Sequence, residues 1–226
     1  MSIKKGESEY ICINCQSPSE SLFIEYSSEV IRLTECEKCG KVVDKYIECD
    51  MVLLSVDLIL QYIEAYRHFL CNLQIQKSYR LFVIFLLSHA YETWVYERSK
   101  QNMEKIYDLE LIFYKSVLSS VCELSVFVAS IIAFDIVKRR GFPSTERIKS
   151  LGFATLFGFY GCVAVVLSII FRLSDQPAYQ IVVRLFILIS HLQVQRVMFP
   201  NVSIVENTIV IIISKLFSVT AGYRVL

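Results

Sequence analysis

The sequence lacks a surplus of charge of either sign. It has 23 lysine and arginine residues against 22 aspartate and glutamate residues, a formal net charge of +1 at pH 7. Proteins that attract nucleic acid through their overall field usually carry a clear basic surplus, so we expect no nucleic-acid partner. Residues 1–15 also lack an apolar run. We therefore expect no cleavable signal peptide, and the first apolar span would act as the targeting signal.

Groups suited to catalysis are also scarce. The three histidines, His68, His89 and His191, are far apart in the sequence, and no pair of carboxylates stands out. An enzyme needs a nucleophile, a positioned acid or base, or a metal with an open position. Side chains that are distant in sequence can converge in a fold, but nothing here predicts such a group. We expect no catalytic activity.

What the sequence does contain is hydrophobic residues, which make up 54% of the chain and are unevenly distributed. Residues 1–50 are rich in charge, whereas residues 151–171 contain none. The pattern predicts a small zinc-ribbon head over residues 1–49, an interfacial amphipathic helix and linker over 50–77, and an all-α polytopic membrane domain with four or five transmembrane helices over 78–226.

The zinc prediction rests on two C-x2-C pairs among eight cysteines. Cys12 and Cys15 form the first pair and Cys36 and Cys39 the second, with twenty residues between the pairs. Each pair offers two thiolates from one tight loop, and four thiolates complete a tetrahedral site with no position open for water. The spacing predicts one structural Zn²⁺. Gly40, directly after the second pair, is expected to adopt a positive φ.

Two other uses of the cysteines fit part of the pattern. An even count suits disulfides, but without a signal peptide the head would not reach an oxidising compartment. A redox C-x-x-C should open a helix within a βαβ unit, which this segment lacks. Residues 22–26 and 30–34 instead predict two short strands joined by a polar turn at 27–29. A hairpin between two cysteine pairs is a zinc ribbon, and in so small a head the metal would supply much of the folding energy.

Residues 50–72, which we call the junction segment, predict one amphipathic helix. Its polar residues recur at helical spacing on one face, and the wide apolar remainder suits a helix that lies in the membrane interface. The polar stripe could instead pack against the head or against membrane helices. Glu64 and His68 could form a headgroup or proton-handling pair, or merely a solvated i, i+4 pair, and Arg67 with His68 could meet a phosphate. The stripe consists of Asp50, Asp57, Gln61, Glu64 and His68.

The membrane domain is expected to contain up to five spans. A basic cluster over residues 138–149 places that loop in the cytosol, and counting back two spans places the head there too. The same count puts the glycosylation acceptor sequence at Asn201 on the cytosolic side, where it would not be modified. The predicted spans are residues 79–96, 111–137, 151–171, 179–199 and 203–222.

Several ionisable residues lie within these spans, and Glu123 is near the centre of its span. Charges at membrane depth face a bundle interior, a partner or a cavity, so Glu123 either contacts a lipid or partner or forms a structural contact between helices. Gly152, Gly158 and Gly161 predict close helix packing, within the chain or with another subunit.

Together, the two cysteine pairs and the junction segment resemble the ARV family (ACAT-related protein required for viability). The resemblance covers about residues 10–72. The residues that carry it are Cys12, Cys15, Cys36 and Cys39, the segment 46–50, the segment 57–60, Tyr66-Arg67-His68 and Asn72.

The resemblance implies a multi-pass membrane protein of the endoplasmic reticulum, with the Golgi as a second location. It further implies a role in sterol distribution and lipid homeostasis, with links to sphingolipid metabolism and to glycosylphosphatidylinositol precursors. Membrane lipids would be its ligands. The alternative is a non-catalytic accessory subunit of a membrane-bound biosynthetic enzyme. The residues expected to contact lipid or a partner are Asp57, Glu64, Arg67, His68 and Glu123.

Overall fold

The structure is a computed structural model that describes residues 10–27, 30–73, 79–100, 106–171, 173 and 176–225. The chain divides into two compact units, Met1–Ile75 and Gln76–Leu226. The start of the predicted head, the turn positions Ser28 and Glu29, and linker residues 74–77 lie outside the described residues.

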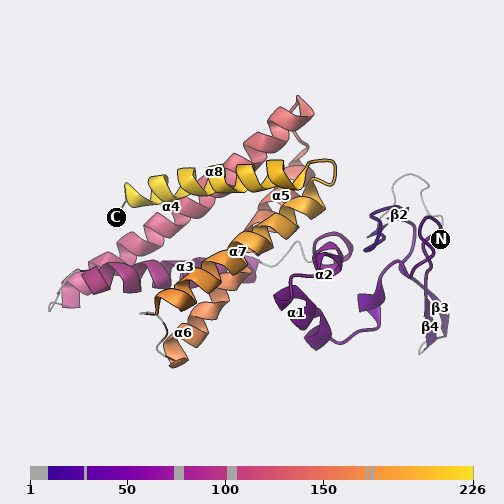
Figure 1. Ribbon diagram of the computed structural model, residues 1–226, viewed down its shortest axis with the longest axis horizontal. Helices are drawn as coiled ribbons and strands as arrows, with labels where there is room; N and C mark the ends of the chain where they lie inside the picture. The colour runs from indigo at the N-terminus through magenta and orange to yellow at the C-terminus, as the bar shows by residue number, and fades with distance from the viewer. Residues whose placement is uncertain are drawn as a thin grey trace. The chain divides into compact units, whose positions relative to one another are not determined.

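The first unit contains two small antiparallel sheets. Strand β1 (Tyr10–Ile11) pairs with β2 (Pro18–Ser19), and β3 (Phe23–Ser27) pairs with β4 (Val30–Leu33) (Figure 1). The second hairpin confirms the two predicted strands. The core of the head is small and includes two of the cysteines. Its buried members are Cys12, Leu22, Cys36 and Val43.

The junction segment belongs to this first unit and is not one helix. The 3-10 turn η1 (Lys45–Ile47) precedes it, and the segment itself comprises helix α1 (Met51–Ile59), helix α2 (Ile63–Arg67) and a π-helical turn η2 (His68–Asn72). The prediction of a continuous helix over residues 50–72 is therefore wrong. The break lies at Gln61, whose φ of 62° is left-handed. The hydroxyl of the fully buried Tyr66 donates to Gln61 Oε1 at 2.6 Å, a contact that a straight helix would not form.

The second unit is helical throughout its regular elements. All five predicted spans fall on helical segments, and the buried core joins four of these elements through Phe127, Leu151, Phe159 and Ile211. Helix α8 runs antiparallel to α4, because Glu123 meets Lys215 and Lys138 meets Glu206 (Figure 1). The elements are α3 (Tyr79–Lys100), α4 (Ile106–Arg139), α5 (Thr145–Phe157), η3 (Gly158–Ala164), α6 (Val165–Phe171), α7 (Pro177–Met198) and α8 (Ile204–Tyr223).

Three helices in the described part of the chain are long and apolar enough to cross a membrane: Tyr107–Arg139, Pro177–Met198 and Ile204–Tyr223. Residues 151–171 do not form a single helix as expected, because the 3-10 segment η3 separates α5 from α6. A total of four or five spans stays a prediction.

Two glycines, Gly158 and Gly161, lie in the 3-10 segment η3. A Cβ built on Gly158 would lie 2.3 Å from Nδ1 of His191, and a Cβ on Gly161 would lie 2.6 Å from the ring of Phe186. Both neighbours are on α7, so these two glycines serve close packing within the chain. Glycine also costs helix stability relative to alanine, which fits the tighter winding at this point.

We expect Gly158→Ala to destabilise the second unit, because the added methyl group would overlap the buried His191 ring. Overpacking of this kind costs about 1–3 kcal/mol. Gly152→Ala is the matched control, since its Cβ would meet only Val128 at 3.9 Å. Thermal unfolding of the detergent-solubilised chain measures both variants. Equal midpoints for the two would contradict the packing described here.

Two turns of the second unit lie at the same end of its helices. Lys138 Nζ donates to Glu206 Oε1 at 2.7 Å, and Arg147 Nη2 donates to the Met198 carbonyl at 3.0 Å. The basic α4–α5 turn and the α7–α8 turn that contains Asn201 are thus neighbours. The two turns must lie on the same side of any membrane that these helices cross.

Candidate functional site

The two cysteine pairs adopt the same backbone arrangement. In the first, the Gln16 amide donates to the Cys12 carbonyl at 2.9 Å and the Cys12 amide to the Ser17 carbonyl at 2.8 Å. In the second, the Gly40 and Cys36 amides repeat both bonds at 2.8 Å. The residue after each second cysteine is left-handed, with φ of 61° at Gln16 and 67° at Gly40. The predicted positive φ of Gly40 is confirmed.

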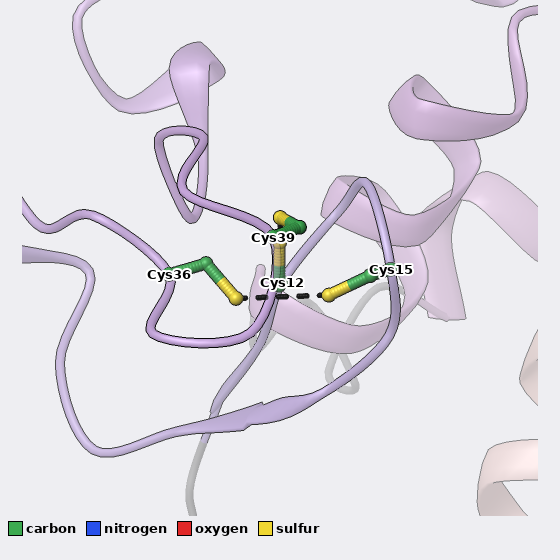
Figure 2. Close-up of side chains that lie close together, drawn as sticks. All are labelled: Cys12, Cys15, Cys36 and Cys39. Atoms are coloured by element: carbon green, nitrogen blue, oxygen red, sulfur yellow. Dashed lines mark hydrogen bonds between the residues drawn. The ribbon is translucent and has the colours of Figure 1, made fainter.

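The four thiols converge on one point (Figure 2). All four Sγ atoms lie within 4.8 Å of one another, and the Cys12–Cys39 and Cys15–Cys36 sulfur pairs are 3.8 and 3.6 Å apart. Zinc–sulfur bonds of about 2.3 Å in a tetrahedron place the sulfurs about 3.8 Å apart. The four cysteines can therefore hold a metal ion, and their distances fit zinc.

The thiols also differ in acidity, because they share hydrogen bonds. The Ser17 hydroxyl lies 2.9 Å from Cys15 Sγ and 3.0 Å from Cys36 Sγ. This contact is the largest cause that lowers the pKa of both, that of Cys36 to about 6. At Cys39 the Lys41 amide lowers the pKa, but burial and the neighbouring thiols outweigh it and raise the pKa to about 11. Four such thiols ionise together readily only around a cation.

Asp44 is the centre of the polar network beside the cysteines. Its side chain is fully buried. Oδ1 accepts from the Tyr46 amide at 3.0 Å, and Oδ2 lies 2.6 Å from both His68 Nδ1 and Asn72 Nδ2. Three groups from two segments, η1 and η2, therefore depend on one carboxylate.

Two junction side chains hold the first cysteine loop by its main chain. Asn72 accepts from the Ile11 amide and donates to the Ile11 carbonyl, both at 3.0 Å. Arg67 Nη1 donates to the carbonyls of Ile13 and Asn14, both at 2.7 Å. The junction segment is therefore the support of the cysteine site.

We expect Arg67→Lys to weaken metal binding about 10- to 100-fold, the usual effect of losing a group that orients metal ligands. A lysine ammonium cannot reproduce the planar guanidinium on two adjacent carbonyls. Arg32→Lys, at an exposed position in β4, is the control. Competition of the full chain with a metal chelator measures the affinity. If both variants hold metal as tightly as the unaltered chain, Arg67 does not support the site.

Three of the predicted contact residues in the junction segment have partners within the head. They are Asp57, Arg67 and His68. Asp57 Oδ2 accepts from the Tyr46 hydroxyl at 2.6 Å, and burial, reinforced by this carboxylate, raises the pKa of Tyr46. His68 pairs with Asp44 rather than with Glu64, and Arg67 holds the cysteine loop. Glu64 lies half-buried in the first turn of α2. Lipid or partner contact at these residues stays a prediction.

Sequence reasoning missed Asp44 and Ser17 altogether. Tyr46 and Asn72 were part of the family resemblance, but no role followed from it. A short polar side chain in a loop gives no periodic signal, so nothing local identified Asp44 as buried. Ser17 follows a C-x2-C pair at a position where many residues fit.

Glu123, the remaining predicted contact, lies where three helices of the second unit meet. Its carboxylate accepts from Lys215 Nζ of α8 and lies 3.6 Å from His89 Nε2 of α3. His89 Nδ1 is 3.1 Å from Ser120 Oγ, and Lys215 Nζ lies 5.4 Å from the centre of the Phe159 ring. A charge near the middle of a membrane helix is thus paired inside the bundle.

A model of the Arv1-like family matches residues 11–195, which covers the cysteine site, its support and most of the second unit. The chain belongs to the Arv1-like family. The match confirms the resemblance and extends it well beyond residues 10–72. Membership of this family supports a role in lipid homeostasis, and the three candidate membrane helices support a membrane protein.

Curated relatives of this Arv1-like chain include proteins from animals and fungi. Protein ARV1 of Bos taurus is 32% identical over 199 residues, covering 84% of this chain and 69% of its own. Protein ARV1 of Homo sapiens is 31% identical, covering 84% and 72%. Protein ARV1 of Saccharomyces cerevisiae is 50% identical over 62 residues, covering 27% and 19%. No solved structure matches the chain.

Proposed function

We propose that the protein is a non-catalytic membrane protein of the endoplasmic reticulum that distributes sterols and related lipids. In this role it supports sphingolipid metabolism and the supply of glycosylphosphatidylinositol precursors. Four thiolates hold a structural zinc ion with no open position, so the metal serves the fold and not a reaction. The membrane unit is the part that handles lipid.

The observation that carries this proposal is the polar group around Glu123. His89, Glu123 and Lys215 come from three helices and meet inside the helical unit. Ionisable residues inside membrane helices commonly mark binding sites or paths for polar groups. Lys215 keeps 42% of its side chain exposed while its ammonium pairs with Glu123, so this group reaches the surface of the unit that lipid would cover.

The basic α4–α5 turn supports a cytosolic side for this end of the unit. Helix α3 packs antiparallel to α4, since Trp94 Nε1 donates to the Leu109 carbonyl and His89 lies beside Ser120. The start of α3 therefore points toward the same end as the basic turn. This arrangement supports a cytosolic head, and it predicts that Asn201 carries no glycan.

Photoreactive sterol analogues test the proposal on the full chain reconstituted in lipid nanodiscs. Labelling should concentrate on peptides of α3, α4 and α8 and fall severalfold in Glu123→Gln. Lys149→Met is the control, because Lys149 forms an exposed pair with Glu146. Equal labelling of every helix, unchanged by Glu123→Gln, would refute direct sterol handling. Recovery of stoichiometric partners in mild detergent would then favour the accessory-subunit alternative.

A cellular test addresses the broader role. In Saccharomyces cerevisiae cells that lack their own Protein ARV1, expression of this chain should restore the normal distribution of sterol between membranes. Variants of the cysteine site should fail to do so. Normal restoration by a chain without Glu123 and Lys215 would separate the cellular role from the polar group.

A further inference from the structure

Helix α1 has its polar side turned toward the protein. Asp57 is the only charged residue between positions 51 and 62, and it is 9% exposed and bonded to the Tyr46 hydroxyl. Leu54, on the same side, is 4% exposed. The inner side of α1 is thus held by the hydrogen bond of Asp57 to Tyr46, by its ion pair with Lys45 at 3.7 Å and by the buried Leu54.

The outer side of α1 is apolar and exposed. Met51, Val52 and Ile59 keep 68%, 73% and 61% of their surface accessible. Exposed apolar surface on this scale marks a site that another apolar phase covers. We call the exposed apolar residues of α1, together with two that follow the helix, the α1 patch. It comprises Met51, Val52, Leu53, Val56, Ile59, Leu60 and Tyr62.

The chemistry of the α1 patch favours lipid over a protein partner. Its members are aliphatic except for Met51 and Tyr62, and none is charged. Protein interfaces concentrate their binding energy in tryptophan, tyrosine and arginine that make hydrogen bonds. A lipid surface needs only apolar side chains, with an aromatic residue such as Tyr62 at the polar boundary.

The length of the connecting chain keeps the patch close to a bilayer. Six residues separate Asn72, the end of η2, from Tyr79, the start of α3, and so short a segment spans at most about 25 Å. The second unit carries the candidate membrane helices, so this tether gives the patch a high effective concentration at the membrane surface.

We propose that the α1 patch inserts into one leaflet of the bilayer and fixes the zinc head to the membrane surface. The inserted side is the outer, apolar side, and the polar stripe faces the head. Acidic residues outnumber basic ones in residues 10–73. Insertion therefore rests on apolar contact, and anionic lipid should not strengthen it. The proposal is independent of which lipid the membrane unit handles.

A tryptophan placed in the patch tests this on the full chain in vesicles of neutral phosphatidylcholine. The chain has one tryptophan, Trp94, so Trp94→Phe provides the background. In Val56→Trp, emission should shift to the blue and fall at least twofold when brominated phosphatidylcholine replaces the ordinary lipid. Glu20→Trp, at an exposed position in the head, is the control and should not respond. Addition of phosphatidylserine should change neither result.

Two outcomes would overturn the proposal. Quenching of Val56→Trp by aqueous iodide, as for Glu20→Trp, would place the patch in water. Blue-shifted emission that brominated lipid does not quench would show that protein covers the patch, whether the second unit, another copy or a partner. Ile59→Trp provides a second reporter if Val56→Trp does not fold, and metal content confirms that the head is intact in each variant.

Discussion

Replacing Cys36 by serine is expected to remove the metal and unfold the head. The serine hydroxyl is a poor ligand for zinc, and three thiolates leave the tetrahedron open. Binding of a structural zinc ion contributes about 10–16 kcal/mol at pH 7 in small zinc domains, which is more than a head of this size gains from its core. Metal analysis should fall from one zinc per chain to near zero, and residues 10–73 should become sensitive to protease.

Cys49→Ser is the matched control for this prediction. Cys49 lies in the same head but outside the cysteine site, and its thiol donates to the Lys45 carbonyl at 3.2 Å. This variant should retain both metal and protease resistance. A Cys36→Ser chain that stays resistant without metal would show that the head folds by its core alone, and the structural role of the metal would be wrong.

Asp44→Ala should produce the second large effect. The change removes a hydrogen-bond partner from the side chains of His68 and Asn72 and from the amide of Tyr46, because all three contact this buried carboxylate. A buried polar group left without its partner costs about 1–3 kcal/mol, so the loss of these three contacts together is expected to cost about 3–5 kcal/mol. Hydrogen exchange of the full chain measures this loss at the Ile11 and Tyr46 amides, whose protection should fall by two to four orders of magnitude (each factor of ten is about 1.4 kcal/mol).

Asp50→Ala controls for the loss of an acidic side chain. Asp50 precedes α1, but its carboxylate makes no capping hydrogen bond, so its removal should change stability by less than about 0.5 kcal/mol. Equal effects of the two substitutions would mean that Asp44 acts only through its charge, and that its hydrogen bonds do not hold the head together.

The cysteine site and the apolar helices were predictable because each follows from a local constraint. A tetrahedral thiolate site requires two short loops, and the spacing of Cys12, Cys15, Cys36 and Cys39 shows both. A helix that crosses a bilayer needs about twenty apolar residues. Helices α7 and α8 begin and end within two residues of the predicted spans 179–199 and 203–222.

The support of the cysteine site was not predictable, because it depends on contacts between distant residues. The polar stripe of residues 50–72 has the spacing of an exposed helix face, yet Asp57 and His68 are buried against Tyr46 and Asp44. Periodicity shows which residues share a face, and it cannot show whether water or a hydrogen-bonding protein covers that face. The break at Gln61 was hidden as well, because neither its left-handed φ nor the local bond from the Tyr66 hydroxyl to its side chain leaves a periodic signal in the sequence.

The bonds between Asn72 and Ile11 join residues 61 positions apart. During synthesis the chain leaves the ribosome from its N-terminus, so strand β1 has no partner on this side until residue 72 has been made. Closing so long a loop also delays folding relative to the local hairpin β3–β4. Helix α3 begins only seven positions after Asn72. Completion of the head therefore coincides in time with the emergence of α3, the first helix of the membrane unit. A delay in either step would leave the unfinished head and the apolar helix exposed together.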